Sequence, residues 1–238
     1  MKKILFLLLL TCGFLNAQIV NIPDATFKAE LLAASPTVQK AQNFSDQWIK
    51  IDANNDGEIQ EIEAQQVKLL AISELLVFNV AGIEGFSNLE TLRITTSLMS
   101  TFDASGLANL KSLTCLNMPL LSTLNVNGAT SLDNLSLFSL PNITTLNISN
   151  LTNLEKLTCL GISIPSLNIS GLPNLSEILY SGNSITTSMI LNDLPGLTKL
   201  DCGYNNLSVL TATGLTALTE LNCSGNQLTN LNGFPNLV

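Results

Sequence analysis

A period of 21 to 22 residues is the feature of this sequence that most restricts its fold. Apolar residues recur at that spacing in a first column, with only the last interval shorter, at Val67, Leu89, Leu110, Leu132, Leu154, Leu175, Leu197, Leu218 and Leu237. A second column follows three residues later, at Leu70, Leu92, Leu113, Leu135, Leu157, Ile178, Leu200 and Leu221. A third lies two residues further on, at Ile72, Ile94, Cys115, Leu137, Cys159, Tyr180, Cys202 and Cys223. About eight copies of one structural unit are therefore expected.

Each unit reads as one short strand with a buried face, because the second and third columns alternate with polar residues. A single strand of this kind cannot bury its apolar face alone. Stacked units bury it together and place their strands side by side in a parallel sheet. The sequence therefore predicts a solenoid with one short strand per turn.

The segments LTKLDCGYNNL (197–207) and LTELNCSGNQL (218–228) resemble the leucine-rich repeat, and the repeat length is most similar to the secreted bacterial, internalin-like type. The resemblance covers residues 67–238 and implies a leucine-rich repeat solenoid. In that family an asparagine after the third column satisfies backbone groups inside the turn, and Asn183, Asn205 and Asn226 match it. Earlier turns depart from the pattern, so their backbone must be satisfied in another way; that position holds Ser97, Met118, Leu140 and Ile162.

The cysteines of the repeats are expected to be buried free thiols. All four occupy the third column, where other turns carry Ile, Leu or Tyr: Cys115, Cys159, Cys202 and Cys223. Cys202 and Cys223 lie in adjacent turns, but side chains that point in the same direction fit disulfide geometry poorly. No C-x-x-C pair or histidine accompanies them, which argues against a metal site.

An acidic stretch just before the repeats matches the pattern of a calcium-binding loop. Five of the 18 acidic residues fall within residues 52–63, and Gly57 stands where such a loop turns sharply. The stretch resembles the EF-hand loop, also found in dockerin modules. The resemblance implies one structural Ca²⁺, with Gln60 acting through water, Glu58 offering its carbonyl, and ligands at Asp52, Asn54, Asp56, Glu58 and Glu63. The alternative is a solvated acidic turn without a metal.

Only one such loop exists, which speaks against cohesin binding and calcium sensing. A helix is expected before it, with Asp24 as its N-cap and a stop at Ser35 and Pro36. The exposed first turn of a solenoid needs a cover. Residues 18–66 are therefore interpreted as an N-terminal cap clamped by calcium.

The first 17 residues read as a secretory signal peptide, with Lys2 and Lys3 ahead of the apolar run Ile4 to Leu10, and Ala17 before the expected cleavage. The apolar run is too short to span a bilayer. Lipid attachment at Cys12 is the alternative. The protein is thus expected to be secreted or held on the outer cell surface.

Charge and composition exclude several function classes. Without the signal peptide the net charge is −10, which is not expected of a protein that binds nucleic acid. Histidine is absent, which excludes His-based triads and His-ligated metals. The repeats contain no nucleophile with a base, no phosphate loop and no convincing acid pair, so no enzyme activity is expected.

The leading interpretation is a recognition or adhesion protein that binds a protein or glycan on the sheet of the solenoid. An apolar stripe on the outward face is the expected ligand site: Leu116, Phe138 and Leu160, with Leu179 nearby in the next turn. The opposing possibility is that these side chains tuck inward. Two other functions stay open, a targeting portion of a longer secreted enzyme and a structural spacer.

Overall fold

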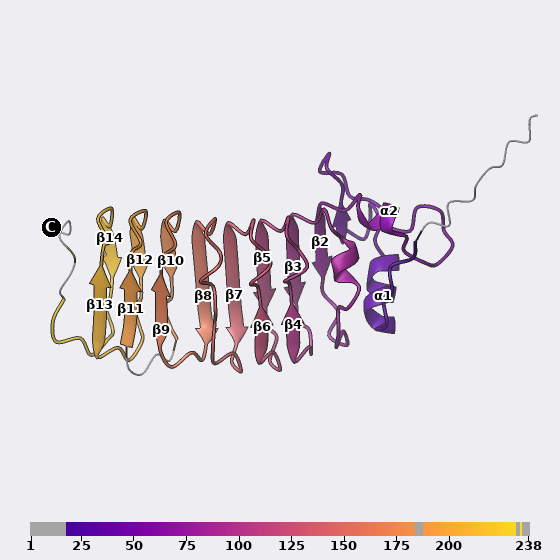
Figure 1. Cartoon of the computed structure of the whole chain (residues 1–238). Helices are drawn as coiled ribbons and strands as arrows, with labels where there is room; N and C mark the ends of the chain where they lie inside the picture. The colour runs from indigo at the N-terminus through magenta and orange to yellow at the C-terminus, as the bar shows by residue number, and fades with distance from the viewer. Residues whose placement is uncertain (1–17, 184–187, 232–233, 235–238) are drawn as a thin grey trace, which may run out of the picture.

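The protein is a long solenoid with a small cap at its N-terminal end (Figure 1). It is a computed structural model that describes residues 18–183, 188–231 and 234. The expected signal peptide, its Cys12 alternative and Leu237 lie outside these residues. Within them, no helix is long and apolar enough to cross a membrane.

The cap begins with the expected helix α1 (Ala25–Leu32), and the Asp24 side chain accepts the Phe27 N–H at 2.9 Å, as an N-cap does. The acidic loop follows and leads into the short helix α2 (Glu61–Ala64). Glu30 joins the cap to the first turn, because its carboxylate contacts Lys40 Nζ at 2.5 Å and accepts the Ser73 N–H at 2.8 Å.

One sheet of nine strands runs along the whole solenoid. Eight strands are parallel and come from successive turns, so they delimit seven complete turns, while β1 pairs antiparallel with β2 and covers the edge at the cap. In order the strands are β1 (Ala41–Gln42), β2 (Leu69–Ile72), β3 (Thr91–Thr95), β5 (Ser112–Leu116), β7 (Asn134–Leu140), β8 (Lys156–Ile162), β10 (Glu177–Leu179), β12 (Lys199–Asp201) and β14 (Glu220–Asn222).

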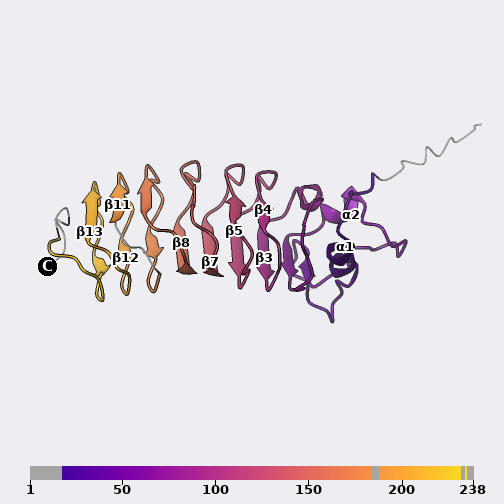
Figure 2. The same ribbon diagram turned by 90° about the horizontal axis from the view of Figure 1, so that it is seen from below.

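A second set of strands lies on the opposite side of the solenoid (Figure 2). The expectation of one strand per turn was therefore incomplete. Two short parallel sheets form there: one contains β4 (Thr101–Asp103) and β6 (Thr123–Asn125), the other β9 (Leu167–Ser170), β11 (Ser188–Asn192) and β13 (Val209–Thr213). The first turn has the 3₁₀ helix η1 (Ile83–Gly85) beyond the corresponding position.

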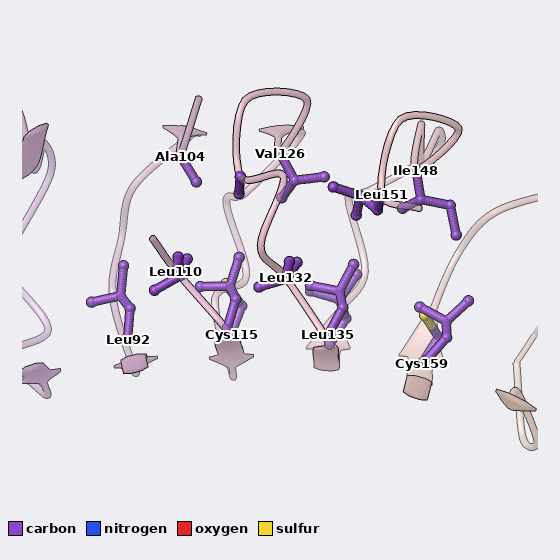
Figure 3. Packing of buried hydrophobic residues seen from close by; sticks show 14 of the residues in the cluster. Leu92, Ala104, Leu110, Cys115, Val126, Leu132, Leu135, Ile148, Leu151 and Cys159 are labelled. Carbon is purple, nitrogen blue, oxygen red and sulfur yellow. The ribbon is translucent and has the colours of Figure 1, made fainter. Parts of the chain in front are cut away.

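The core is a stack of apolar rows between the two sides (Figure 3). Described members of the three sequence columns are buried, apart from Leu221 and Cys223 in the last turn, which are partly exposed. Rows from the second side, such as Ala104, Val126 and Ile148, meet them from across the core. Each turn thus buries its face against its two neighbours, as the period predicts.

The turns at the carboxyl ends of the main strands are closed in two ways. Asn183 and Asn226 act as expected: their Nδ2 groups donate to the carbonyls of Cys159 and Cys202, at 2.8 and 2.9 Å. In the middle turns the corresponding residues are apolar and buried, and β7 and β8 continue to Leu140 and Ile162, which pair with each other. The longer strands thus supply part of the pairing in these turns, and the Ile162 N–H donates to Asn183 Oδ1 of the next turn at 2.8 Å.

Candidate functional site

The outward face of the main sheet carries the apolar row expected from the sequence. Leu116 pairs with Phe138, and Phe138 pairs with Leu160, so the three side chains occupy one row across β5, β7 and β8. Leu116 is 39% exposed, and the other two are partly exposed, whereas their strand neighbours Cys115 and Leu137 are buried. We call Leu116, Phe138 and Leu160 the apolar row.

The backbone of the apolar row is held by the turn that follows each strand. Thr96 and Asn117, the residues that directly follow β3 and β5, adopt a positive φ of 54°. This conformation lets Thr96 N–H donate to Leu116 O and Asn117 N–H donate to Phe138 O, both at 2.9 Å. The row is therefore presented on a hydrogen-bonded backbone rather than on a loose loop.

Leu179 lies in the next turn but in a different row. It pairs with Thr158, so it extends the polar middle row formed by Thr114, Ser136 and Thr158 and stands diagonally from Leu160. It is partly exposed on the same face. The surface is thus an apolar row with one apolar neighbour at its end.

Charged residues form a separate row at the amino-terminal ends of the same strands. Glu177 lies between Lys156 and Lys199, at 3.7 and 3.1 Å. The hydrogen bond that Lys199 donates to Glu177 raises the pKa of Lys199 above its usual value. The face therefore has an apolar side and a charged side, which would give a partner a defined orientation.

Sequence reasoning missed a second set of apolar residues, which follow the carboxyl ends of β2, β3 and β5. Leu76, Leu98 and Leu120 are spaced by 22 residues, and Leu76 and Leu120 are 56% and 47% exposed. The period itself was the signal that could have identified them. They form a second set of exposed or partly exposed apolar side chains, which follows the carboxyl ends of β2, β3 and β5.

The acidic loop of the cap is folded by its own side chains. Asp52 is buried and accepts the N–H groups of Asp56 and Gly57, at 3.2 and 3.3 Å. Asn54 Oδ1 accepts the Asp56 N–H at 2.9 Å, and Asp56 Oδ1 accepts the Glu58 N–H at 2.8 Å. Gly57 has φ of 82°, a conformation that side chains disfavour.

Glu63 closes the loop from the other side. Its Oε1 accepts the Ala53 N–H at 2.8 Å and its Oε2 accepts the Gln60 N–H at 3.0 Å, which also caps α2. Ile59 is fully buried, and its carbonyl accepts the Val20 N–H at 2.8 Å. The loop is thus fastened to the N-terminal segment and to the core.

The expected calcium ligands lie in one loop, but their carboxylates are not gathered around one point. Among the described residues, no group of three or more His, Cys, Asp and Glu side chains is placed to hold a metal ion. The oxygens of Asp52, Asp56 and Glu63 instead accept N–H groups. The Glu58 N–H and the Asn54 amide lower the pKa of Asp56, so this carboxylate is ionised at neutral pH.

The four cysteines of the repeats are unpaired, and three of them are buried. Burial raises the pKa of Cys115 and of Cys202 to about 12. Cys223 differs from the expectation, because it is partly exposed in the last described strand, which has no described strand on its far side.

Comparison with known proteins agrees with this architecture. The family model described as leucine-rich repeats (2 copies) matches residues 195–236. No curated protein matches. Among solved structures, a leucine-rich repeat protein of Leptospira interrogans is similar over 66% of this chain and 43% of its own, with 20% identity and a TM-score of 0.55.

Two Listeria monocytogenes proteins are also similar. Internalin C2 aligns over 92% of this chain and 94% of its own, with 19% identity and a TM-score of 0.53. The functional domain of InlJ, described as including a cysteine ladder, aligns over 91% and 50%, with 22% identity and a TM-score of 0.51. This chain spans about half of the InlJ functional domain and less than half of the Leptospira chain. At these identities the likeness concerns the fold, and the chain folds as a leucine-rich repeat solenoid of the kind seen in internalins.

Proposed function

We propose that this protein is a secreted or cell-surface recognition protein that binds a partner through the apolar row, without catalysis. The observation that carries the proposal is the exposure of Leu116, Phe138 and Leu160 on a rigid outward face. Contiguous apolar surface with an aromatic residue at its centre is typical of interfaces. The flat face and the separate charged row favour a folded protein over a glycan as the partner.

The cap has a supporting role in this proposal, as a clamp that binds one Ca²⁺. Each carboxylate oxygen has two lone pairs, so an oxygen that accepts one N–H can still bind a cation. Asp52, Asn54, Asp56 and Glu63 would supply side-chain oxygens, and Glu58 its carbonyl, after a shift of Glu63 toward the others. The hard oxygen donors fit calcium. The mutual repulsion of the carboxylates would favour the metal-bound form.

The binding proposal is tested with the mature chain on an array of purified extracellular proteins and neutral glycans. Phe138→Ala should weaken binding to a genuine partner by more than about 1 kcal/mol, or roughly fivefold. Phe78→Ala is the matched control, since Phe78 is a 56% exposed phenylalanine outside the apolar row. Partners whose affinity is equal for both variants would contradict a role for the apolar row.

Export is tested separately. We expect the product recovered outside the producing cell to begin at Gln18, as measured by intact mass. An acylated product beginning at Cys12 would instead support the lipid-anchored alternative.

A further inference from the structure

The second side of the solenoid has a gap between its first two turns. One period before Phe102 of β4 lies Val80, yet residues 79–81 form no strand. In the part of the chain that the structure describes, β4 pairs with β6 on one side and with no strand on the other. We call the space between residues 79–84 and β4 the seam.

The cap holds the first turn away from β4. Asp24 Oδ2 accepts the N–H groups of Phe78 and Asn79, both at 3.1 Å. Gly82 has φ of 97° and packs so closely on the N-terminal segment that an added Cβ would lie 2.5 Å from Asn21 O. The position of the first turn is thus set by its contacts with the cap.

Two N–H groups of the first turn are satisfied by its own side chains rather than by β4. Asn79 Oδ1 accepts the Ala81 N–H at 2.6 Å, and Glu84 Oε2 accepts the Gly82 N–H at 2.9 Å. Most later turns form a strand ladder at this position, although residues 145–147 between β6 and β9 form no strand either. These two N–H groups therefore need no acceptor in β4.

The free edge of β4 faces the seam. The Ala104 N–H donates to Asn125 O at 2.8 Å. The backbone N–H and C=O groups of Ala104 and, by alternation, of Phe102 therefore point toward β6. The N–H and C=O groups of Thr101 and Asp103 then point the other way, into the seam. The main sheet contrasts with this, because β1 pairs with β2 and covers its edge. An uncovered row of such groups is a template for another strand.

The seam is a cavity of about 370 Å³ with acidic walls. Glu84 and Asp103 line it, together with apolar groups that include Val80 and Phe102, and its lining contains no lysine or arginine. Hydrogen bonds from Ser105 lower the pKa of Asp103, so its carboxylate is ionised at neutral pH. Glu84 packs against Gly106, where an added Cβ would lie 3.1 Å from Glu84 Cβ, so the seam is narrow at that end.

We propose that the seam binds an extended peptide segment that carries Lys or Arg, which pairs as a strand with the edge of β4. Main-chain hydrogen bonds to Thr101 and Asp103 supply the pairing, as in other cases of strand addition. Glu84 and Asp103 select a basic segment by charge. The seam is separate from the apolar row, so the proposal of peptide binding at the seam and the proposal of partner binding at the apolar row are tested independently.

The probe is an acetylated and amidated pentapeptide with a central valine between two arginines and a threonine at each end. Its binding to the full mature chain is measured by fluorescence polarisation with a labelled copy. We expect saturable binding with a Kd below about 1 mM. Methylation of the backbone nitrogens of the two arginines should abolish binding, because it removes the N–H donors that pair with a strand. Replacement of both arginines by glutamate should abolish binding as well.

Two protein variants test the role of charge. Asp103→Asn should weaken binding about three- to tenfold. Asp193→Asn, an exposed acid in the turn after β11 and away from the seam, should leave binding unchanged. Equal binding of the N-methylated peptide, or equal effects of the two variants, would overturn the proposal, as would the absence of binding up to 1 mM.

Hydrogen exchange tests the edge without relying on either variant. In the free protein the Asp103 N–H should exchange rapidly while the Phe102 N–H is protected, and the peptide should protect Asp103 alone. Strong protection of Asp103 in the free protein would show that the edge is already paired and would refute the inference.

Discussion

Replacement of Tyr180 by phenylalanine should stabilise the protein. Tyr180 is fully buried in the third column between Cys159 and Cys202, and its hydroxyl has no hydrogen-bond partner among the described residues. Burial raises the pKa of the Tyr180 phenol well above its usual value, so the group is neutral. A buried hydroxyl without a partner costs about 1–3 kcal/mol, while the ring keeps its packing in phenylalanine.

The expected gain for Tyr180→Phe is about 1–2 kcal/mol after a small allowance for the void left by the oxygen. For a chain of this size that corresponds to a rise in Tm of roughly 2–8 °C. Urea unfolding followed by circular dichroism measures the change in the free energy of unfolding, and an unchanged m-value shows that the denatured state is not affected. The control is Tyr204→Phe, which should be neutral because Tyr204 is 69% exposed. A loss of stability in Tyr180→Phe would refute the reasoning, since it would mean that the hydroxyl is hydrogen-bonded.

Four further predictions concern the cap and the thiols. Glu30→Ala should lower the free energy of unfolding by about 3–5 kcal/mol, because it leaves the ammonium of Lys40, whose side chain is only 13% exposed, without its partner; a loss below about 1 kcal/mol in urea would contradict this. Calcium at about 10 mM should raise Tm by a few degrees for a Kd of roughly 10⁻⁴ to 10⁻³ M, and Glu63→Gln should remove the effect; calorimetry without binding heat would disprove the clamp. Thiol titration at pH 8 should label only Cys223 before denaturation and all four cysteines after it. Because burial raises the pKa of Cys115 to about 12, only the unfolded thiol ionises above about pH 9, so stability should fall as pH rises from there toward 12; a flat pH profile would count against this assignment.

The period of the sequence was sufficient to predict the stack and its core. A residue that recurs every 21 to 22 positions occupies the same place in each turn, so burial of one member implies burial of the others. The N-cap of the first helix was also predicted correctly from the sequence, because the Asp24 side chain caps α1. Strand alternation likewise placed Leu116, Phe138 and Leu160 in one outward row.

Features that depend on contacts between distant segments were decided only by the tertiary structure. Leu140 and Ile162 show this, because the missing asparagine did not reveal that β7 and β8 would lengthen and pair across the turn. Calcium binding also stays a prediction, since the motif specifies the donors while the placement of Glu63 depends on its bonds to Ala53 and Gln60.

The seam is the clearest case of this division. The period places Val80 one turn before Phe102, at the position where β4 and β6 pair in the next two turns. Asp24, more than fifty residues away from Phe78 and Asn79, accepts their N–H groups and keeps the first turn on the cap. A repeat pattern describes what each turn shares with its neighbours, whereas the contacts between the first turn and the cap occur once and depend on segments distant in sequence.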